Sequence, residues 1–211
     1  LSGHARRKED PMEIKEEPDR AAGIKNALEQ RRSYYAINNV LPVAEKTVET
    51  LVEEFTELVP DAFNMKSSRA VVVFGDAHRK LWDNIEGAFG GKVPKEKIES
   101  FRAGAGTILY FFDSATVQAM QEKFPRYAEN FPVWAQQASG MLQFAIWSGL
   151  RECGIGASLQ HYNPVIDGAV RAQFGLSDDW KLVAQMPFGG IVSEPEPKEK
   201  EDISRRVSVF R

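Results

Sequence analysis

The sequence contains little cysteine and little histidine, and it lacks a long apolar run. Cys153 is the one cysteine among 211 residues, so an intramolecular disulfide is excluded and a reducing cytoplasm is the expected compartment. The apolar runs are too short and interrupted to span a bilayer, and the polar N-terminus has no secretory signal. The three histidines and Cys153 match no metal-ligand spacing. We therefore expect a cytoplasmic protein with no membrane span and no bound metal.

A surplus of positive charge is also missing. The formal net charge is −3 and the basic residues are spread along the chain, which argues against a nucleic-acid-binding module. The apolar and charged fractions, 43% and 27%, are those of an ordinary soluble globule. Residues 1–18 mix charges with prolines and have few apolar residues, so we expect a disordered leader or an expression remnant there. Residues 19–211 are predicted to form a single domain.

Apolar residues recur at helical spacing in some segments and form strand-like runs in others. The longest predicted helix, at 133–153, is apolar over much of its circumference, as is typical of a helix in a core or an interface. Strands separated mainly by helices indicate an α+β or an α/β sandwich, and propensities do not decide between the two. The predicted helices are 19–30, 44–58, 78–85, 95–103, 115–124, 133–153 and 165–174, and the predicted strands are 69–74, 107–112, 155–159 and 181–186.

Arg31, Arg32 and Ser33 follow the first predicted helix and form a candidate phosphate site. Two guanidinium groups and a hydroxyl can hold one dianionic phosphate from several sides, because guanidinium forks match phosphate oxygens bidentately. Taken alone, an Arg-Arg pair at a helix end is more often a solvated charge pair. The glycine pairs in 104–106 and 154–156 do not offer a second phosphate site, because each lacks the third glycine of a dinucleotide fingerprint.

Three further segments accompany the arginine pair in order along the chain. They are Pro60-Asp61-Ala62-Phe63-Asn64 with Ser67-Ser68-Arg69 after it, Gly154 through Pro164, and Gln185-Met186-Pro187-Phe188-Gly189-Gly190. In this order the segments resemble the nitroreductase superfamily of FMN-dependent oxidoreductases. The most similar branch is the one named for a fungal fatty-acid repression mutant, through its Ala-Phe-Asn, Gln-His-Tyr-Asn-Pro and Pro-Phe-Gly segments.

The resemblance covers roughly residues 20 to 210 and carries expectations about the fold. It implies an α+β, nitroreductase-like sandwich in which helices flank a central, mostly antiparallel sheet. It also implies an intertwined homodimer whose sites take residues from both chains, so a monomer is expected to bind FMN poorly.

The resemblance further implies which residues bind the FMN phosphate. Tyr35 departs from the family pattern, because many members have a basic residue there, so one charge contact is lost or replaced by a hydroxyl. The tail residues are not ranked, and the alternative for each is a solvated position in a mixed-charge tail. The implied phosphate-binding residues are Arg31, Arg32 and Ser33 and, from the C-terminal tail, Lys198, Lys200 and Arg206.

At the flavin ring the family presents backbone N–H groups, so for His161 the backbone is expected to matter more than the imidazole. Lys97 corresponds to a family position that often contacts the pyrimidine edge of the flavin. Asp61, Ala62 and Asn64 would reach the ring from the partner subunit. The implied ring-binding residues are therefore Leu159, Gln160, His161 and Tyr162, together with Asp61, Ala62, Asn64 and Lys97.

Aromatic residues have two interpretations. They either wall a pocket over the flavin and stack against aromatic substrates, or they fill the core, which is the commoner role for any one of them. The residues concerned are Phe63, Tyr127, Phe131, Trp134, Tyr162 and Phe188.

No acid–base pair in the sequence is required to carry a reaction, which fits a flavoenzyme in which the flavin N5 carries the hydride. The first hypothesis is an FMN-dependent NAD(P)H oxidoreductase that uses NADH or NADPH and reduces a small aromatic acceptor, such as a nitroaromatic or a quinone, in ping-pong order. The second hypothesis is a flavin-binding regulatory or stress-response protein with little turnover. Tyr35 and the crowded aromatic positions motivate this alternative, since they would weaken cofactor retention or restrict substrate access.

Overall fold

The computed structural model describes residues 19–211, so the leader predicted at residues 1–18 lies outside the described residues. The described part folds around a five-stranded sheet of order β1-β5-β3-β2, and β4 also pairs with β5. All of these strand pairings are antiparallel. The strands are β1 (Ile37–Asn38), β2 (Ser68–Phe74), β3 (Gly106–Asp113), β4 (Ile155–Ala157) and β5 (Trp180–Ile191). The predicted α+β class is thus confirmed.

Strand β5 is longer than the predicted 181–186, and it continues through Pro187 to Ile191. Its last part contains Gly189 and Gly190, which are poor strand formers but allow β1 to approach closely. A Cβ on Gly189 would lie 2.1 Å from the carbonyl oxygen of Asn38, and one on Gly190 would lie 2.2 Å from that of Val40. Because β1 has only two residues, it shows no alternation that sequence inspection could detect.

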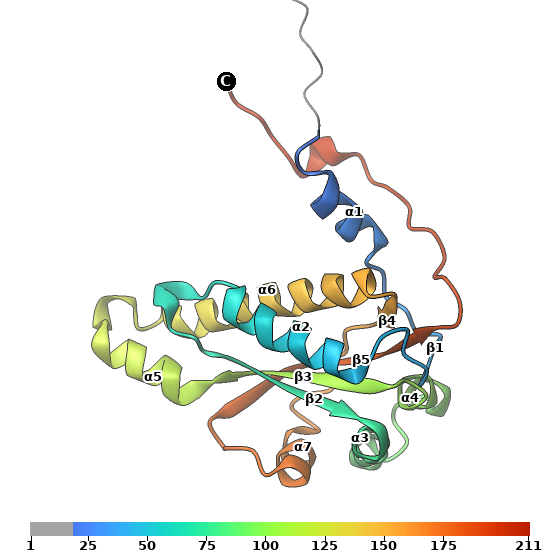
Figure 1. The fold of residues 1–211 in the computed structure, drawn as a ribbon. Coiled ribbons are helices and arrows are strands. Elements are labelled where there is room, and N and C mark those ends of the chain that lie inside the picture. Colours follow the sequence, from blue (N-terminus) through green and yellow to red (C-terminus); the bar gives the residue numbers. More distant parts are fainter. Residues whose placement is uncertain (1–18) are drawn as a thin grey trace, which may run out of the picture.

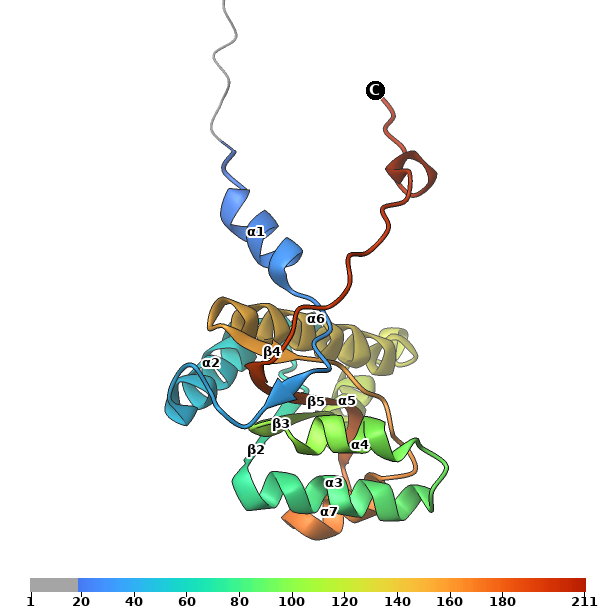
Figure 2. The same ribbon diagram turned by 90° about the vertical axis from the view of Figure 1, so that its right-hand side faces the viewer.

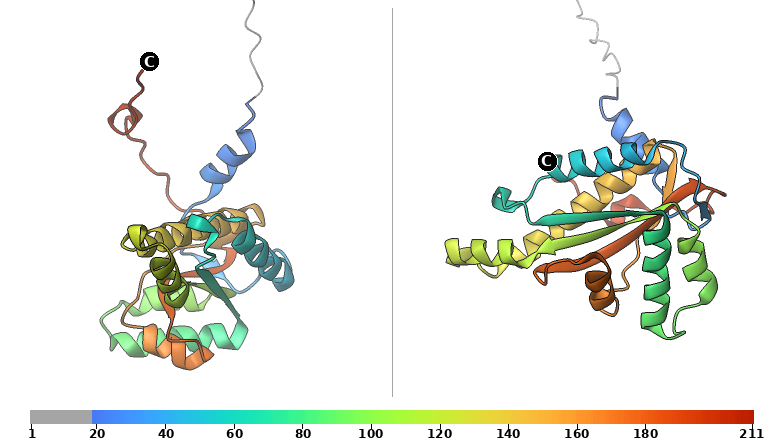
Figure 3. Two further views of the ribbon diagram at one scale, coloured as in Figure 1. Left: turned by 90° about the vertical axis from the view of Figure 1, so that its left-hand side faces the viewer. Right: turned by 60° about the horizontal axis from the view of Figure 1, so that its bottom comes forward.

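Helices cover both faces of the sheet (Figure 1). On one face lie α2 (Glu45–Leu58) and α6 (Asn130–Glu152), and on the other lie α3 (Gly75–Phe89), α4 (Lys95–Arg102) and α7 (Asp167–Phe174), as the turned view in Figure 2 also shows. Helix α5 (Ser114–Lys123) extends from the far end of β3, and Asp113 caps it by accepting from the N–H groups of Ala115 and Thr116. Helix α1 (Ala22–Gln30) and the C-terminal tail project from the body on the same side (Figure 3).

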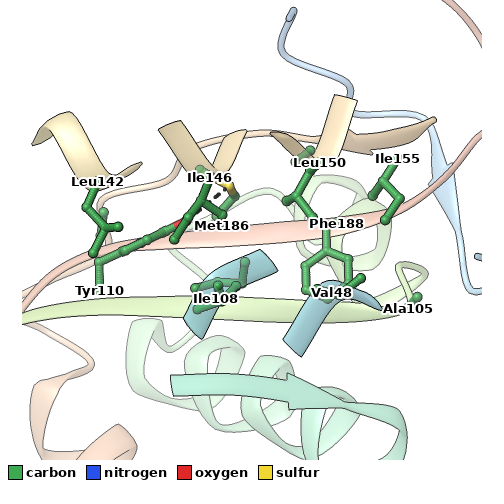
Figure 4. Packing of buried hydrophobic residues seen from close by; sticks show 13 residues of the cluster. Val48, Ala105, Ile108, Tyr110, Leu142, Ile146, Leu150, Ile155, Met186 and Phe188 are labelled. Atoms are coloured by element: carbon green, nitrogen blue, oxygen red, sulfur yellow. Dashed lines mark hydrogen bonds between the residues drawn. The ribbon is translucent and has the colours of Figure 1, made fainter. Parts of the chain in front are cut away.

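The core between the sheet and α6 follows from strand alternation. Ile108 and Tyr110 point to the α2–α6 face, while their neighbours Leu109 and Phe111 point to the α3–α4–α7 face. Figure 4 shows the first of these cores, where Ile146 and Leu150 of α6 meet the sheet. The labelled cluster residues are Val48, Ala105, Ile108, Tyr110, Leu142, Ile146, Leu150, Ile155, Met186 and Phe188.

A buried polar cluster joins α3, β3 and the end of α4 on the opposite face. The hydroxyl oxygen of Thr107 accepts from the indole N–H of Trp82 over 2.9 Å, and it lies 2.9 Å from Nδ1 of His78. The Nε2 atom of His78 lies 3.3 Å from the carbonyl oxygen of Arg102. A carbonyl only accepts, so Nε2 carries the proton and Nδ1 accepts from the Thr107 hydroxyl. Every polar side-chain atom in this cluster therefore has a partner.

Helix α1 has no buried residue and leaves Ile24 (64%) and Leu28 (43%) largely exposed. Together with Phe55 and Phe144, these two residues line a groove of about 320 Å³ between α1, α2 and α6. Among residues 19–211, no helix combines the length and the apolar character that a membrane crossing requires.

Candidate functional site

The segment that follows α1 runs beside the end of β4. Ser33 forms a parallel bridge with Ala157, and the backbone N–H of Tyr34 donates to the carbonyl oxygen of Ala157 over 2.9 Å. The indole N–H of Trp147 on α6 donates to the same carbonyl oxygen over 3.1 Å. These bonds fix the predicted phosphate segment 31–33 between α6 and the residues that follow β4.

Arg31 and Arg32 have no carboxylate partner in the described part of the chain. The Arg31 guanidinium lies 4.2 Å from the ring centroid of Trp147, a cation–π arrangement that leaves its edge donors available. The Nε atoms of both arginines are buried and have no hydrogen-bond partner among residues 19–211. Burial, and then the neighbouring charge of Arg32, lower the pKa of Arg31 below its ordinary value. Two partly buried guanidinium groups with unused donors favour a multiply charged anion.

Residues 160–163 are held against β5 by Gln185, which is fully buried. The backbone of Gln185 exchanges two hydrogen bonds with Gln160, over 2.7 and 2.9 Å. Its side-chain oxygen accepts from the backbone N–H of Tyr162 over 2.8 Å, and its amide nitrogen donates to Oδ1 of Asn163 over 3.3 Å. One glutamine therefore sets the shape of the loop that follows β4.

The same bonds determine which N–H groups of the loop are available to a ligand. The N–H groups of Ser158 and Gln160 donate to β5, so those of Leu159 and His161 point the opposite way along the extended backbone. Within the described residues, the N–H groups of Leu159 and His161 have no acceptor. Of the four predicted ring-binding residues in this loop, Gln160 and Tyr162 thus use their N–H groups inside the protein, and Leu159 and His161 remain as donors.

Asp61, Ala62 and Asn64 lie at a strained turn near the other end of α6. The residues Phe63, Asn64 and Lys66 have φ values of 55°, 51° and 52°, a left-handed conformation that is costly for residues other than glycine. Asp61 stabilises the turn by accepting from the backbone N–H and the hydroxyl of Ser67, each over 2.7 Å. The second oxygen of Asp61 is buried without a partner in the described chain.

This turn and the arginine pair contact different parts of α6. The Phe63 ring stacks near Trp134, with centroids 5.7 Å apart, whereas Arg31 lies over Trp147. Trp134 and Trp147 are thirteen residues apart on one helix, about 20 Å at 1.5 Å per residue. Within one chain, the structure therefore does not bring Asn64 together with Arg31.

The other predicted binding residues are on α4 and on the C-terminal tail. Lys97 is an exposed residue in the first turn of α4. Lys198 and Lys200 are exposed on the tail, and Arg206 pairs with Glu201, its Nε lying 3.6 Å from a carboxylate oxygen. The roles proposed for these residues remain predictions.

The six aromatic residues separate into three groups. Tyr162 packs on the α3–α4 side, with its ring centroid 5.3 Å from that of Phe89, and Phe188 is a core residue. The third group surrounds Phe63. Because Phe63 and Tyr127 are 50% and 38% exposed, this group can face a ligand. The residues gathered around Phe63 are Phe124, Tyr127, Phe131 and Trp134.

Comparison with known proteins agrees with this architecture. The nitroreductase family model matches residues 28–190. The nitroreductase FRM2 of Saccharomyces cerevisiae is 32% identical over 188 residues, which cover 88% of this chain and 95% of that protein. The nitroreductase CinD of Lactococcus lactis, solved in complex with chloramphenicol, superposes with a TM-score of 0.85 at 39% identity and covers 89% of this chain and 100% of its own.

A nitroreductase structure from Saccharomyces cerevisiae gives a TM-score of 0.73 at 31% identity, covering 81% of this chain and 97% of that one. CinD has also been solved with nicotinic acid and with 4-nitrophenol. The chain therefore belongs to the nitroreductase family, and it is an oxidoreductase of the nitroreductase type.

Sequence inspection did not assign a role to Gln185 or to Trp147. Gln185 gives one signal, because it is a lone amide in the apolar strand Leu-Val-Ala-Gln-Met-Pro-Phe. Trp147 gives none, since its place beneath Arg31 depends on how α6 lies across the end of β4.

Proposed function

We propose that this protein is an FMN-dependent NAD(P)H oxidoreductase that reduces nitroaromatic or quinone-like acceptors. The observation that carries the proposal is the pair Arg31 and Arg32, whose buried Nε atoms have no partner among residues 19–211. Beside them lies a loop with two N–H donors that likewise have no acceptor in that part of the chain. This donor set fits a ligand with a dianionic phosphate at one end and a hydrogen-bonding ring at the other. The aromatic compounds bound to CinD support the acceptor class.

The residues would divide the binding of FMN between them. Arg31, Arg32 and Ser33 bind the phosphate through charge-assisted hydrogen bonds. The N–H groups of Leu159 and His161 donate to the polar edge of the ring, and Gln185 keeps the loop rigid for this task. When bound, FMN would supply the chemistry of hydride transfer between the nicotinamide and the second substrate.

We propose that the active unit is a homodimer with shared sites. Two observations support this. Asp61, Ala62 and Asn64 lie about 20 Å along α6 from the arginine pair of the same chain, so a partner copy is needed to place them at the ring. The groove formed by Ile24, Leu28 and Phe144 leaves apolar surface that a second copy would cover. A cytoplasmic location is part of the same proposal.

An absorbance titration tests the function. The purified protein is mixed with FMN and then, anaerobically, with NADH or NADPH, and a nitroaromatic or a quinone is added last. We expect the flavin bands to bleach on reduction and to return with the acceptor. Arg32→Ala is expected to weaken FMN binding, whereas an unchanged FMN affinity in this variant would contradict the assignment of the phosphate site.

A second candidate is a flavin-binding regulatory or stress-response protein with little turnover. It is favoured by Tyr35, which is half-exposed and packs against Phe101 with ring centroids 6.1 Å apart, where many relatives would place a positive charge. Flavin bands that appear with FMN but do not bleach with either nicotinamide would support this candidate and contradict the first.

A further inference from the structure

Three segments that are distant in sequence meet at the buried hydroxyl of Tyr34, which is 2% exposed. This hydroxyl donates to Oε2 of Glu194 in the C-terminal tail over 2.8 Å. It also accepts from Nε of Arg151, at the end of α6, over 3.1 Å. Burial first, and then the hydrogen bond to Glu194, raise the pKa of Tyr34, so the hydroxyl keeps its proton and remains a donor. We call Tyr34, Arg151 and Glu194 the tail junction.

Charge and stacking reinforce the tail junction. The Arg151 guanidinium lies 5.6 Å from the Tyr34 ring centroid, and its terminal nitrogen is 3.9 Å from the Glu194 carboxylate. Another contact of Arg151 reaches Gln30, the last residue of α1, over 3.4 Å. Arg151 therefore touches the residue before the phosphate segment, the residue after it, and the tail.

The phosphate segment itself also holds the tail. Arg32 donates from a terminal guanidinium nitrogen to the backbone carbonyl of Glu196. The backbone N–H of Val192 donates to the carbonyl of Ala36 over 2.9 Å. Residues 192–196 are thus attached to residues 32–36 at both ends, with the Tyr34–Glu194 bond between them.

Beyond Glu196, the hydrogen bonds and ion pairs that the tail forms with residues 19–211 are local. Asp202 bonds to Ser204, and Glu201 pairs with Arg205 and Arg206. The tail leaves the body from the end of β5 and rises on the same side of the body as α1 (Figures 1 and 2). The tail junction therefore determines the direction in which the backbone leaves toward Lys198, because, within the described chain, later residues of the tail bond only to one another.

We propose that Tyr34, Arg151 and Glu194 are positioning residues that fix the C-terminal tail to the phosphate segment, so that tail order and FMN phosphate binding depend on each other. The coupling runs through Arg32. One terminal nitrogen of its guanidinium donates to the tail carbonyl of Glu196, and its buried Nε has no partner within the described chain. If the tail detaches, Arg32 loses the contact that orients its fork. The FMN part of this inference rests on the proposed function, and the attachment of the tail does not.

The experiment compares Tyr34→Phe and Glu194→Ala with the unmodified protein and with Tyr110→Phe. Tyr110→Phe is a matched control, because it removes a buried tyrosine hydroxyl whose contact is the sulfur of Met186, in the core. Glu194→Gln is the conservative variant, since its amide oxygen still accepts from Tyr34. For each protein we would measure amide hydrogen exchange of residues 192–200, the FMN dissociation constant and the melting temperature.

We expect Tyr34→Phe and Glu194→Ala to raise exchange at Val192, whose N–H donates to the carbonyl of Ala36 beside the tail junction. We also expect them to weaken FMN binding by about five- to tenfold, the range for one lost hydrogen bond. Tyr110→Phe should change neither quantity, and Glu194→Gln should restore most of both. A merely structural role would instead lower the melting temperature and raise exchange throughout the domain.

Unchanged exchange in the tail would overturn the attachment, and faster exchange with unchanged FMN affinity would overturn the coupling. Failure of the unmodified protein to bind FMN would overturn the proposed function together with the coupling. In that case the exchange data would still decide whether the tail junction holds the tail.

Discussion

The cluster of Thr107, Trp82 and His78 and the pair Arg31 and Arg32 both contain buried polar atoms, yet these atoms are bonded in opposite ways. In the first, Thr107, Trp82 and His78 use every side-chain donor and acceptor on one another or on a carbonyl. In the second, Arg31 and Arg32 keep buried donors without a partner in the described chain. A buried polar group costs free energy unless it is bonded. The closed cluster therefore serves stability, and we propose that the open one binds a ligand.

The largest expected effect comes from breaking the closed cluster. Thr107→Val keeps the shape of the side chain but leaves the Trp82 N–H and the His78 Nδ1 without partners. Each buried unsatisfied group costs about 1–3 kcal/mol, so we expect the two together to lower the free energy of unfolding by roughly 2–6 kcal/mol. Chemical denaturation measures this loss. Thr116→Val on α5 is the control, and an equal loss in both variants would contradict the special role of the cluster.

Acid should weaken the closed cluster in a defined pH window. Burial above all, and then the charges of Arg79 and Arg102, lower the pKa of His78 from 6.5 to about 4. The neutral ring stabilises the folded state fully above pH 6.5, and this contribution is lost as pH falls through 4, because the unfolded state binds the proton first.

The loss corresponds to about 3 kcal/mol, on the scale of 1.36 kcal/mol for each pKa unit. Urea denaturation at pH 7, 5.5 and 4 would reveal it, and His78→Gln should flatten the profile in this window. A profile of the same slope in His78→Gln would assign the acid sensitivity to other groups.

The open region is tested by removing one guanidinium. Arg31→Ala should leave the fold intact and weaken FMN binding by about ten- to a hundredfold, since a charge-assisted contact contributes roughly 1.5–3 kcal/mol. Fluorescence quenching of FMN measures the affinity. Arg171→Ala is the control, because Arg171 pairs with Asp178 on the α7 side. A similar loss in this control would indicate a general effect of net charge.

A smaller effect is expected when a charge is added to the open region. Tyr35→Lys replaces a half-exposed phenol with an ammonium group, the kind of residue that the family resemblance implies at this position. A partly exposed ion pair contributes up to about 1 kcal/mol, so FMN should bind about two- to fivefold more tightly, and less so at high salt. Tyr35→Met provides the uncharged comparison. Equal affinity in the two variants would show that position 35 does not face the cofactor.

The sequence predicted the elements whose pattern is local and missed those that depend on tertiary contacts. Helices with a clear apolar stripe were predicted to within a few residues, as at 44–58 against the observed Glu45–Leu58, because their pattern is local. The end of β5 at Gly189 and Gly190 was not predicted, because these glycines are required by a tertiary contact with β1 and the residues after it. The α+β class and the family followed from ordered motifs rather than from propensity.

The candidate site was predicted only in part. Arg31, Arg32 and Ser33 were found from residue type, and the structure places them beside the loop that contains Leu159 and His161. The left-handed backbone of Phe63 and the role of Gln185 were not foreseen, since both depend on which groups meet across the fold. The places of Lys97, Lys198, Lys200 and Arg206 relative to a bound cofactor stay predictions.

The most direct test of the open region compares the affinities of FMN and riboflavin, which differ only in the phosphate. If Arg31 and Arg32 bind the phosphate of FMN, this ligand should bind at least about tenfold more tightly than riboflavin, because the phosphate adds one or more charge-assisted contacts. The Arg31→Ala variant should lose most of this difference while keeping its riboflavin affinity. Equal affinities for the two ligands in the unmodified protein would contradict the account.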